Sequence, residues 1–413
     1  MQSGTAGREA RRKAWWLVPW LLFIGLVIAS CFNPSFVPMT SEEGIRLVHV
    51  GTANPWWPST VSPKTTLNEL AFGAGVYLAA FNLLIAVRSR HALRRLLVFG
   101  SVNAVVLAVL GTVQKLSAHG FYFGAAKSPN IRFFSTFTYY NHWGAFMVLW
   151  LAAAGGLMFY HAMRHRSRDL LHSPFTMAVM GVFALAVSAP VSASRAATAM
   201  TGVIVILMLA HAIGRIASHQ RERGRTIWPP VLALLVFSAI ATGAVGWLAY
   251  RSINERYTET RIAMDESQSL LDGRLDLYRD TWKLAMQKPS FGWGLESYDS
   301  AFLLIRPRPI APWRQYEETY QEAHSDWIQS IAETGFVGTG LLLLMALIPV
   351  LTVPRRTLRH PLVAYPLVGC ALIALYAWVE FPFAGAAVFI SFWTVYFSAI
   401  CYAQIEPVRS GES

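Results

Sequence analysis

The sequence predicts an all-α polytopic membrane protein of about ten transmembrane helices, with one large helical loop between the seventh and the eighth. Apolar residues make up 54% of its 413 residues and charged residues only 14%, whereas a soluble domain carries about 25% charged residues. Apolar stretches of about 18 residues or more recur along the chain, which is the length a helix needs to cross a bilayer. Basic residues gather in alternate connecting segments, as in multi-pass membrane proteins.

The apolar stretches define the ten predicted spans. They cover residues 15–32, 67–87, 96–116, 142–161, 174–193, 196–213, 228–250, 335–353, 361–380 and 384–403. We therefore expect a membrane domain over 1–250, a separate loop over 251–334 and a second membrane part over 335–413.

The charge distribution predicts the orientation. Arginines fill the N-terminus and the alternate short loops, for example Arg88, Arg90, Arg94 and Arg95. The loop over 251–334 instead has fourteen acidic and ten basic side chains. Because basic residues stay on the cytoplasmic side, both termini should be cytoplasmic and the loop should lie outside. The net charge of +12 then reflects orientation, and no nucleic-acid partner is expected.

The loop has helical periodicity and should fold on the membrane. Apolar residues at helical spacing predict a helix that ends near Pro289, with one stripe made of Leu271, Leu275, Tyr278, Trp282 and Ala285. A second amphipathic helix is predicted from Glu322 to Thr334, which would place His324 in its first turn.

Three side chains of the predicted outer side could carry chemistry: Arg195, Arg274 and His324. Arginine offers paired, permanently charged donors to a phosphate, and a histidine near a helix N-terminus can act as a general base. Each also has an ordinary reading, as an interfacial arginine, a solvated helix charge or a structural histidine. The cysteines Cys31, Cys370 and Cys401 lie in or beside spans and suggest packing residues. No metal-ligand cluster accompanies His324, so no metal or other cofactor is expected.

Several motifs resemble the O-antigen ligase and polymerase superfamily. They are Ser194-Arg195-Ala-Ala at a span boundary, the run from Gly273-Arg274 through Lys288-Pro289 to Gly292-Trp-Gly294, and the run from Ala323-His324 to Glu333-Thr-Gly335. Tyr139-Tyr140-Asn141-His142 before span four and Glu380-Phe-Pro382 after span nine extend the resemblance over about residues 130–400. The sequence departs from it in two places: Ala196-Ala197 stand where relatives usually have glycines, and Ser325 stands where they usually have Asn.

The resemblance implies a type-C glycosyltransferase of the bacterial inner membrane. Such an enzyme takes a glycan from an undecaprenyl diphosphate carrier at the periplasmic face, without a metal, and a ligase passes it to a sugar of the lipid A core. His324, Arg195 and Arg274 would be the essential residues. Further donor contacts are predicted at Arg279 and Arg132, and acceptor or lipid contacts at Tyr139, Tyr140 and Asn141.

Other functions stay open at this point. A polymerase of O-antigen or exopolysaccharide would add the same donor to another lipid-linked glycan, and a protein O-oligosaccharyltransferase would use Ser or Thr. A transporter of lipid-linked sugars is a rival of another class. Transporters tend to place ionisable groups in mid-span, and here only Glu69 and Glu380 lie near span ends.

Overall fold

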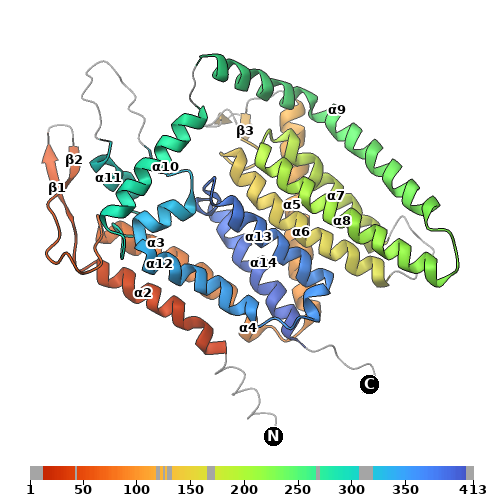
Figure 1. Cartoon of the computed structure of the whole chain (residues 1–413), viewed down its shortest axis with the longest axis horizontal. Coiled ribbons are helices and arrows are strands. Elements are labelled where there is room, and N and C mark those ends of the chain that lie inside the picture. Colours follow the sequence, from red (N-terminus) through yellow and green to blue (C-terminus); the bar gives the residue numbers. More distant parts are fainter. Residues whose placement is uncertain are drawn as a thin grey trace, which may run out of the picture. The chain divides into compact units, whose positions relative to one another are not determined.

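Helices dominate the protein (Figure 1). The computed structural model describes residues 13–41, 44–117, 121–123, 126–127, 133–164, 173–266, 270–306 and 320–405. The α-helices are α2 (Val18–Ser30), α3 (Pro63–Phe81), α4 (Leu83–Ala86), α5 (Arg90–Leu116), α6 (Tyr140–Arg164), α7 (Pro174–Val191), α8 (Arg195–Glu222), α9 (Trp228–Glu266), α10 (Leu270–Gln287), α11 (Tyr298–Ala301), α12 (Asp326–Leu351), α13 (Pro361–Tyr376) and α14 (Ala386–Gln404).

Shorter elements complete the described part of the chain. The 3₁₀ helices are η1 (Trp15–Leu17), η2 (Phe302–Leu304), η3 (Thr357–Arg359) and η4 (Pro382–Ala384). Two antiparallel pairs of strands are β1 (Phe36–Ser41) with β2 (Gly44–His49) and β3 (Phe121–Phe123) with β4 (Ala126–Lys127).

The all-α polytopic prediction is confirmed. Within the described residues, eight helices are long and apolar enough to cross a membrane. The two other predicted spans correspond to the shorter apolar helices Trp15–Ser30 and Pro361–Tyr376. One boundary differs, because α9 continues beyond the predicted span end at residue 250 to Glu266. The start of the predicted loop is therefore a helical extension of the seventh span.

The chain forms two compact units. The first comprises Met1–Ala86, Gln268–Pro354 and Tyr376–Ala384, and the second comprises Val87–Ser267, Arg355–Leu375 and Gly385–Ser413. The predicted division at residues 250 and 334 separates membrane-spanning parts from a loop outside the membrane. It differs in kind from these two units, and it stays a prediction.

The second unit is built around α6. This helix packs against α5, α7, α8 and α14. In an apolar stretch of 18 residues of α6, 94% of the residues are buried. Glycines on α6 let the neighbours approach, since a Cβ at Gly144 would lie 2.6 Å from the Cβ of Ala197 on α8. This contact explains a small residue at Ala197, one of the positions that depart from the family pattern.

In the first unit, α12 packs on α2 and α10. A hydrophobic core of this unit joins the strand β1, the helix α10 and the segment before α12. The members of this core are Phe36, Val61, Leu277, Leu284, Ala285, Trp293, Tyr298, Ala301, Phe302, Ala323, Ile331 and Ala332.

A backbone interlock joins the segment after α10 to the middle of α12; it comprises residues 289–294 and 332–337. The helix breaks at Gly335 (φ 67°), so carbonyl and N–H groups that a continuous helix would pair become available. The N–H groups of Trp293 and Gly294 donate to the carbonyls of Ala332 and Glu333 (2.9 and 2.7 Å). In return, Phe336 N–H donates to Pro289 O (2.8 Å).

The two backbone segments of the interlock lie so close together that no side chain would fit at Gly292 or Gly335. A Cβ at Gly292 (φ 68°) would lie 2.3 Å from the carbonyl carbon of Glu333, and one at Gly335 would lie 2.2 Å from the carbonyl oxygen of Ser290. Glycine is needed at both positions for its left-handed backbone as well as for space. The two glycine motifs of the sequence therefore form one structural joint.

The helix α10 lies where the apolar stripe predicted it, but part of this stripe is exposed. The helix exists where it was expected, and Ala285 is buried, but Leu275 and Trp282 are 56% and 44% exposed. The buried face runs instead through Leu277 and Leu284. Leu275 and Trp282 thus lie outside the buried face, since an apolar helix face in a membrane protein need not point into the protein core.

Candidate functional site

The start of α12 positions His324. Ser325 is the N-cap of this helix, and its hydroxyl accepts from Ile328 N–H (3.4 Å), a role that serine and asparagine share. His324 thus precedes the helix, with a left-handed backbone (φ 55°). The prediction of a helix from Glu322 is wrong by four residues. A non-glycine residue held in this region costs about 1–3 kcal/mol and is typical of functional sites.

The segment Ala377–Phe383 is held against this helix start. Asp326 N–H donates to Glu380 O (3.2 Å), Trp327 N–H to Ala377 O (3.4 Å), and Phe383 N–H to the Asp326 carboxylate (3.0 Å). The bonds from Asp326 and Trp327 satisfy N–H groups that the first turn of a helix leaves unpaired. They also bring Glu380 beside His324, 56 residues away in sequence.

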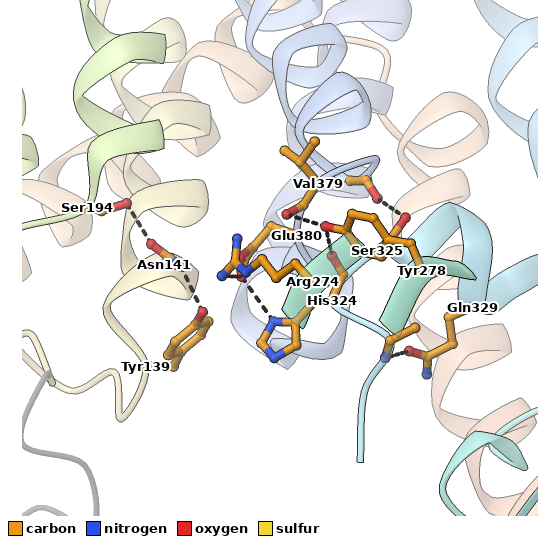
Figure 2. A network of polar contacts seen from close by, with 12 residues as sticks. Tyr139, Asn141, Ser194, Arg274, Tyr278, His324, Ser325, Gln329, Val379 and Glu380 are labelled. Carbon is orange, nitrogen blue, oxygen red and sulfur yellow. Dashed lines mark hydrogen bonds and ion pairs between the residues drawn. The ribbon is translucent and has the colours of Figure 1, made fainter. Parts of the chain in front are cut away.

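Glu380 connects the two predicted catalytic residues of the first unit (Figure 2). Its Oε1 lies 3.4 Å from His324 Nδ1 and accepts from Arg274 Nη2 at 3.4 Å. The Glu380 side chain is 2% exposed, whereas those of Arg274 and His324 are 44% and 33% exposed. The carboxylate is therefore the buried member of the cluster, and the imidazole and guanidinium reach its accessible side.

Tyr278 donates to backbone carbonyls on both sides of this site. It lies one turn after Arg274 on α10, and its hydroxyl is 3.0 Å from His324 O and 3.2 Å from Val379 O. Phe381 packs edge-on against the His324 ring, with centroids 4.7 Å apart. We call Arg274, Tyr278, His324 and Glu380 the His324 cluster.

Glu380 is the member that the sequence-based list of site residues lacked. It belongs to the Glu380-Phe-Pro382 stretch of the resemblance, and a carboxylate at the end of an apolar span is itself a signal of function. Its pairing with His324 was not visible, because it depends on the docking of two distant segments.

A second group of predicted residues gathers in the second unit. Ser194, buried before the first residue of α8, donates to the side-chain oxygen of Asn141 (2.8 Å), and Asn141 Nδ2 donates to the Tyr139 hydroxyl (2.8 Å) (Figure 2). The Tyr139 ring also packs edge-on against Tyr140. Arg195 is an exposed residue in the first turn of α8. The three residues predicted for acceptor or lipid contacts thus lie beside the segment that carries Arg195.

Two further predicted donor contacts are placed differently. Arg279 forms an exposed pair with Asp276 on α10 (3.0 Å), whereas Arg274 pairs with Glu380. Arg132 lies outside the described residues.

The described residues contain no group of three or more His, Cys, Asp or Glu side chains that could hold a metal ion. The chemistry available to the His324 cluster is that of an imidazole paired with a buried carboxylate, beside an arginine. Such a pair can orient a histidine for proton abstraction, and the arginine can bind a phosphate.

The comparison with protein families identifies the domain. Residues 180–343 match the family model described as O-antigen ligase. The chain carries the O-antigen ligase domain. The match confirms the predicted resemblance to the O-antigen ligase superfamily over these residues, and it supports an O-antigen-related membrane glycosyltransferase type. No curated protein matches the chain at a significant level.

The matched part of the O-antigen ligase domain covers three predicted catalytic residues and the interlock. Arg195, Arg274 and His324 all fall within residues 180–343, as do both interlock glycines. Glu380 and the stretch from Tyr139 to Asn141 lie outside the match. The contacts of Glu380 therefore add a residue to the site that the family match alone does not indicate.

Proposed function

We propose that the protein is an O-antigen ligase-type enzyme that moves a glycan from undecaprenyl diphosphate to an acceptor hydroxyl, in lipopolysaccharide biosynthesis. The proposed acceptor is a sugar of the lipid A core, and the proposed place is the periplasmic face of the bacterial inner membrane. The observation that carries the proposal is the joint approach of His324 and Arg274 to one oxygen of Glu380. The family match supports the ligase or polymerase type.

His324 is the proposed general base. With its proton on Nδ1 and directed at Glu380 (3.4 Å), the imidazole keeps a lone pair on Nε2 for the proton of the acceptor hydroxyl. The acceptor oxygen attacks the anomeric carbon as its proton passes to Nε2. The bond from that carbon to the diphosphate oxygen breaks, so undecaprenyl diphosphate leaves and the anomeric configuration inverts. The buried Glu380 carboxylate stabilises the imidazolium that forms.

Arg274 and Arg195 are the proposed diphosphate contacts. The Arg274 side chain is 44% exposed, so it can present its planar donors to an anion. Arg195 adds its charge at the N-terminus of α8, where the helix dipole also favours a negative group. Negative charge develops on the leaving diphosphate, and donors aimed at it lower the barrier. Arg279 and Arg132 are proposed as outer donor contacts, and Tyr139, Tyr140 and Asn141 as acceptor or lipid contacts.

The test is reconstitution of the purified protein with an undecaprenyl-diphosphate glycan and three acceptors: lipid A core, a second lipid-linked glycan, and a Ser/Thr peptide. Mass spectrometry identifies the acceptor that gains the glycan. We expect the lipid A core to gain it; gain by the lipid-linked glycan indicates a polymerase, and gain by the peptide a protein glycosyltransferase.

The same assay tests the base. His324→Ala should lower the transfer rate by roughly 10²–10⁴-fold, the usual contribution of general base catalysis, with little change in melting temperature. His219→Ala, at an exposed histidine in the last turn of α8, is the matched control and should retain the wild-type rate. Near-normal turnover by His324→Ala would contradict the assignment.

A further inference from the structure

Three arginines converge at the end of α6 that lies away from Asn141. Arg90 and Arg94 begin α5, and Arg164 is the last residue of α6. The guanidinium carbons of Arg94 and Arg164 lie 4.8 and 4.9 Å from the centre of the Tyr160 ring. Arg90 lies 4.8 Å from the ring centre of Tyr402 on α14. We call Arg90, Arg94 and Arg164 the arginine cluster.

Among the residues that the structure describes, the arginine cluster has no acidic counterpart. None of its members forms an ion pair with a carboxylate within the described residues, and Arg94 instead donates to the Tyr160 hydroxyl and lies 2.8 Å from His91 Nδ1. The Nε of Arg90 is buried and has no hydrogen-bond partner in the described part of the chain. Three like charges held together with an unsatisfied buried donor are unfavourable unless an anion joins them. Retention of basic residues on one side of a membrane explains their presence there, but not their convergence on two tyrosines.

His360 adds a neutral donor to the arginine cluster. Its ring lies 4.9 Å from Tyr402 and 6.2 Å from Tyr160, and its Nδ1 accepts from Leu362 N–H (3.2 Å). Its proton therefore resides on Nε2. Burial, with Arg90 and Arg164 nearby, lowers the pKa of His360 to about 4. The imidazole therefore stays uncharged at neutral pH and can donate to an anion without adding to the repulsion.

The surface beside the arginine cluster is apolar. Along α5, Val98 and Val102 follow Arg90 and Arg94 at four-residue spacing, so the four residues form one row on the helix. Val98 and Val102 are 40% and 55% exposed, and the neighbouring Phe99 is 73% exposed. Charged groups at the end of an apolar helix, continued by an exposed apolar face, match a phosphate with acyl chains attached.

We propose that the arginine cluster, with His360, binds the phosphate of an anionic membrane lipid whose acyl chains lie along α5. The guanidinium groups supply charged, directional donors, and the tyrosine rings hold them in place. This site lies at the opposite end of α6 from Asn141, and it is independent of the proposed transfer reaction.

The test uses full-length protein in nanodiscs of phosphatidylcholine with or without phosphatidylglycerol, and native mass spectrometry counts the phosphatidylglycerol molecules retained. The variant is the triple change Arg90→Gln, Arg94→Gln and Arg164→Gln. The matched control removes the same charge from exposed arginines of the same unit, by Arg221→Gln, Arg223→Gln and Arg225→Gln. Each clustered arginine should contribute about fivefold to affinity, from about 1 kcal/mol per basic residue near a lipid surface.

The proposal predicts lipid retention by the wild type and by the control triple, and its loss in the cluster triple. Equal retention by both triples, or equal loss, would overturn it. Displacement of the lipid by millimolar inorganic phosphate would also overturn it, because the site would then bind free phosphate. If the cluster triple does not fold in phosphatidylcholine, the single change Arg164→Gln replaces it, since this residue is exposed and packs over the Tyr160 ring. This variant should bind the lipid about fivefold more weakly, and unchanged binding would count against the proposal.

Discussion

The backbone interlock and the His324 cluster belong to the same unit but are built in opposite ways. The interlock uses main-chain hydrogen bonds as short as 2.7 Å and leaves no room for a Cβ at two glycines. The His324 cluster uses side chains 3.4 Å apart, two of which are partly exposed. A rigid joint combined with longer side-chain contacts suits catalysis, since catalytic hydrogen bonds often tighten only when substrate binds. Changes in the interlock should therefore affect folding, and changes in the His324 cluster should affect transfer.

The largest effect should come from the interlock. Gly335→Ala places a Cβ 2.2 Å from Ser290 O at a backbone with φ 67°. Backbone strain of about 1–3 kcal/mol and overpacking of about 1–3 kcal/mol should together prevent stable folding. The measurement is the melting temperature of the detergent-solubilised protein, followed by fluorescence-detected size exclusion.

Gly340→Ala is the control for this change. It lies in the same helix, and a Cβ there would meet nothing within 4 Å, so its melting temperature should equal or exceed that of the wild type. Equal melting of Gly335→Ala and Gly340→Ala would show that the interlock does not depend on its glycines.

A smaller effect is expected at Tyr278, which joins the backbone of the His324 cluster. Tyr278→Phe removes the hydroxyl that reaches His324 O and Val379 O, at a cost of about 0.5–1.5 kcal/mol of stability. Transfer should fall several-fold, because His324 loses part of its support. Kinetics and melting curves of the variant, with Lys283→Gln on the exposed face of α10 as a control, test this. A rate equal to that of the wild type would mean that the other bonds to Ala377–Phe383 suffice.

The smallest effect near neutral pH is a pH dependence at the edge of the interlock, which develops only above about pH 8. The Lys288 ammonium donates to Ser59 Oγ (2.6 Å) and lies over the Trp293 ring. Burial at this place lowers the pKa of Lys288 to about 8. In the unfolded chain the pKa is about 10.5, so between these values the unfolded state binds more protons. Stability should therefore rise as pH increases from about 8 to about 10.5. Lys288→Met should lack this rise, and parallel melting curves of the two proteins across this range would count against it.

Much of the fold was predictable, because hydrophobic length is a strong signal in membrane proteins. All ten spans correspond to helices, although α2 and α13 are short. The helix α10 was predicted, but its buried face was not. An apolar residue such as Trp282 can contact either lipid or the protein core, so hydrophobicity does not show which face is buried. The start of α12 was placed too early because periodicity continues through His324; the N-cap Ser325 followed by Asp326 was the better boundary signal.

The candidate site was predictable residue by residue, but its connections were not. Arg274 and His324 were chosen for their chemistry and lie at one carboxylate. That carboxylate, Glu380, is 106 residues from Arg274. Its role depends on hydrogen bonds between the N-terminus of α12 and Ala377–Phe383, which no local pattern encodes.

The most direct test of the account is a double-mutant cycle on His324 and Glu380, measured as the transfer rate at saturating donor. If Glu380 acts through His324, Glu380→Gln should lower the rate of the wild type by about 10- to 100-fold, less than loss of the base itself. In the His324→Ala background it should have almost no further effect, because residues that act as a unit are not additive. Equal losses in both backgrounds would contradict the claim that the carboxylate works by orienting and stabilising the histidine.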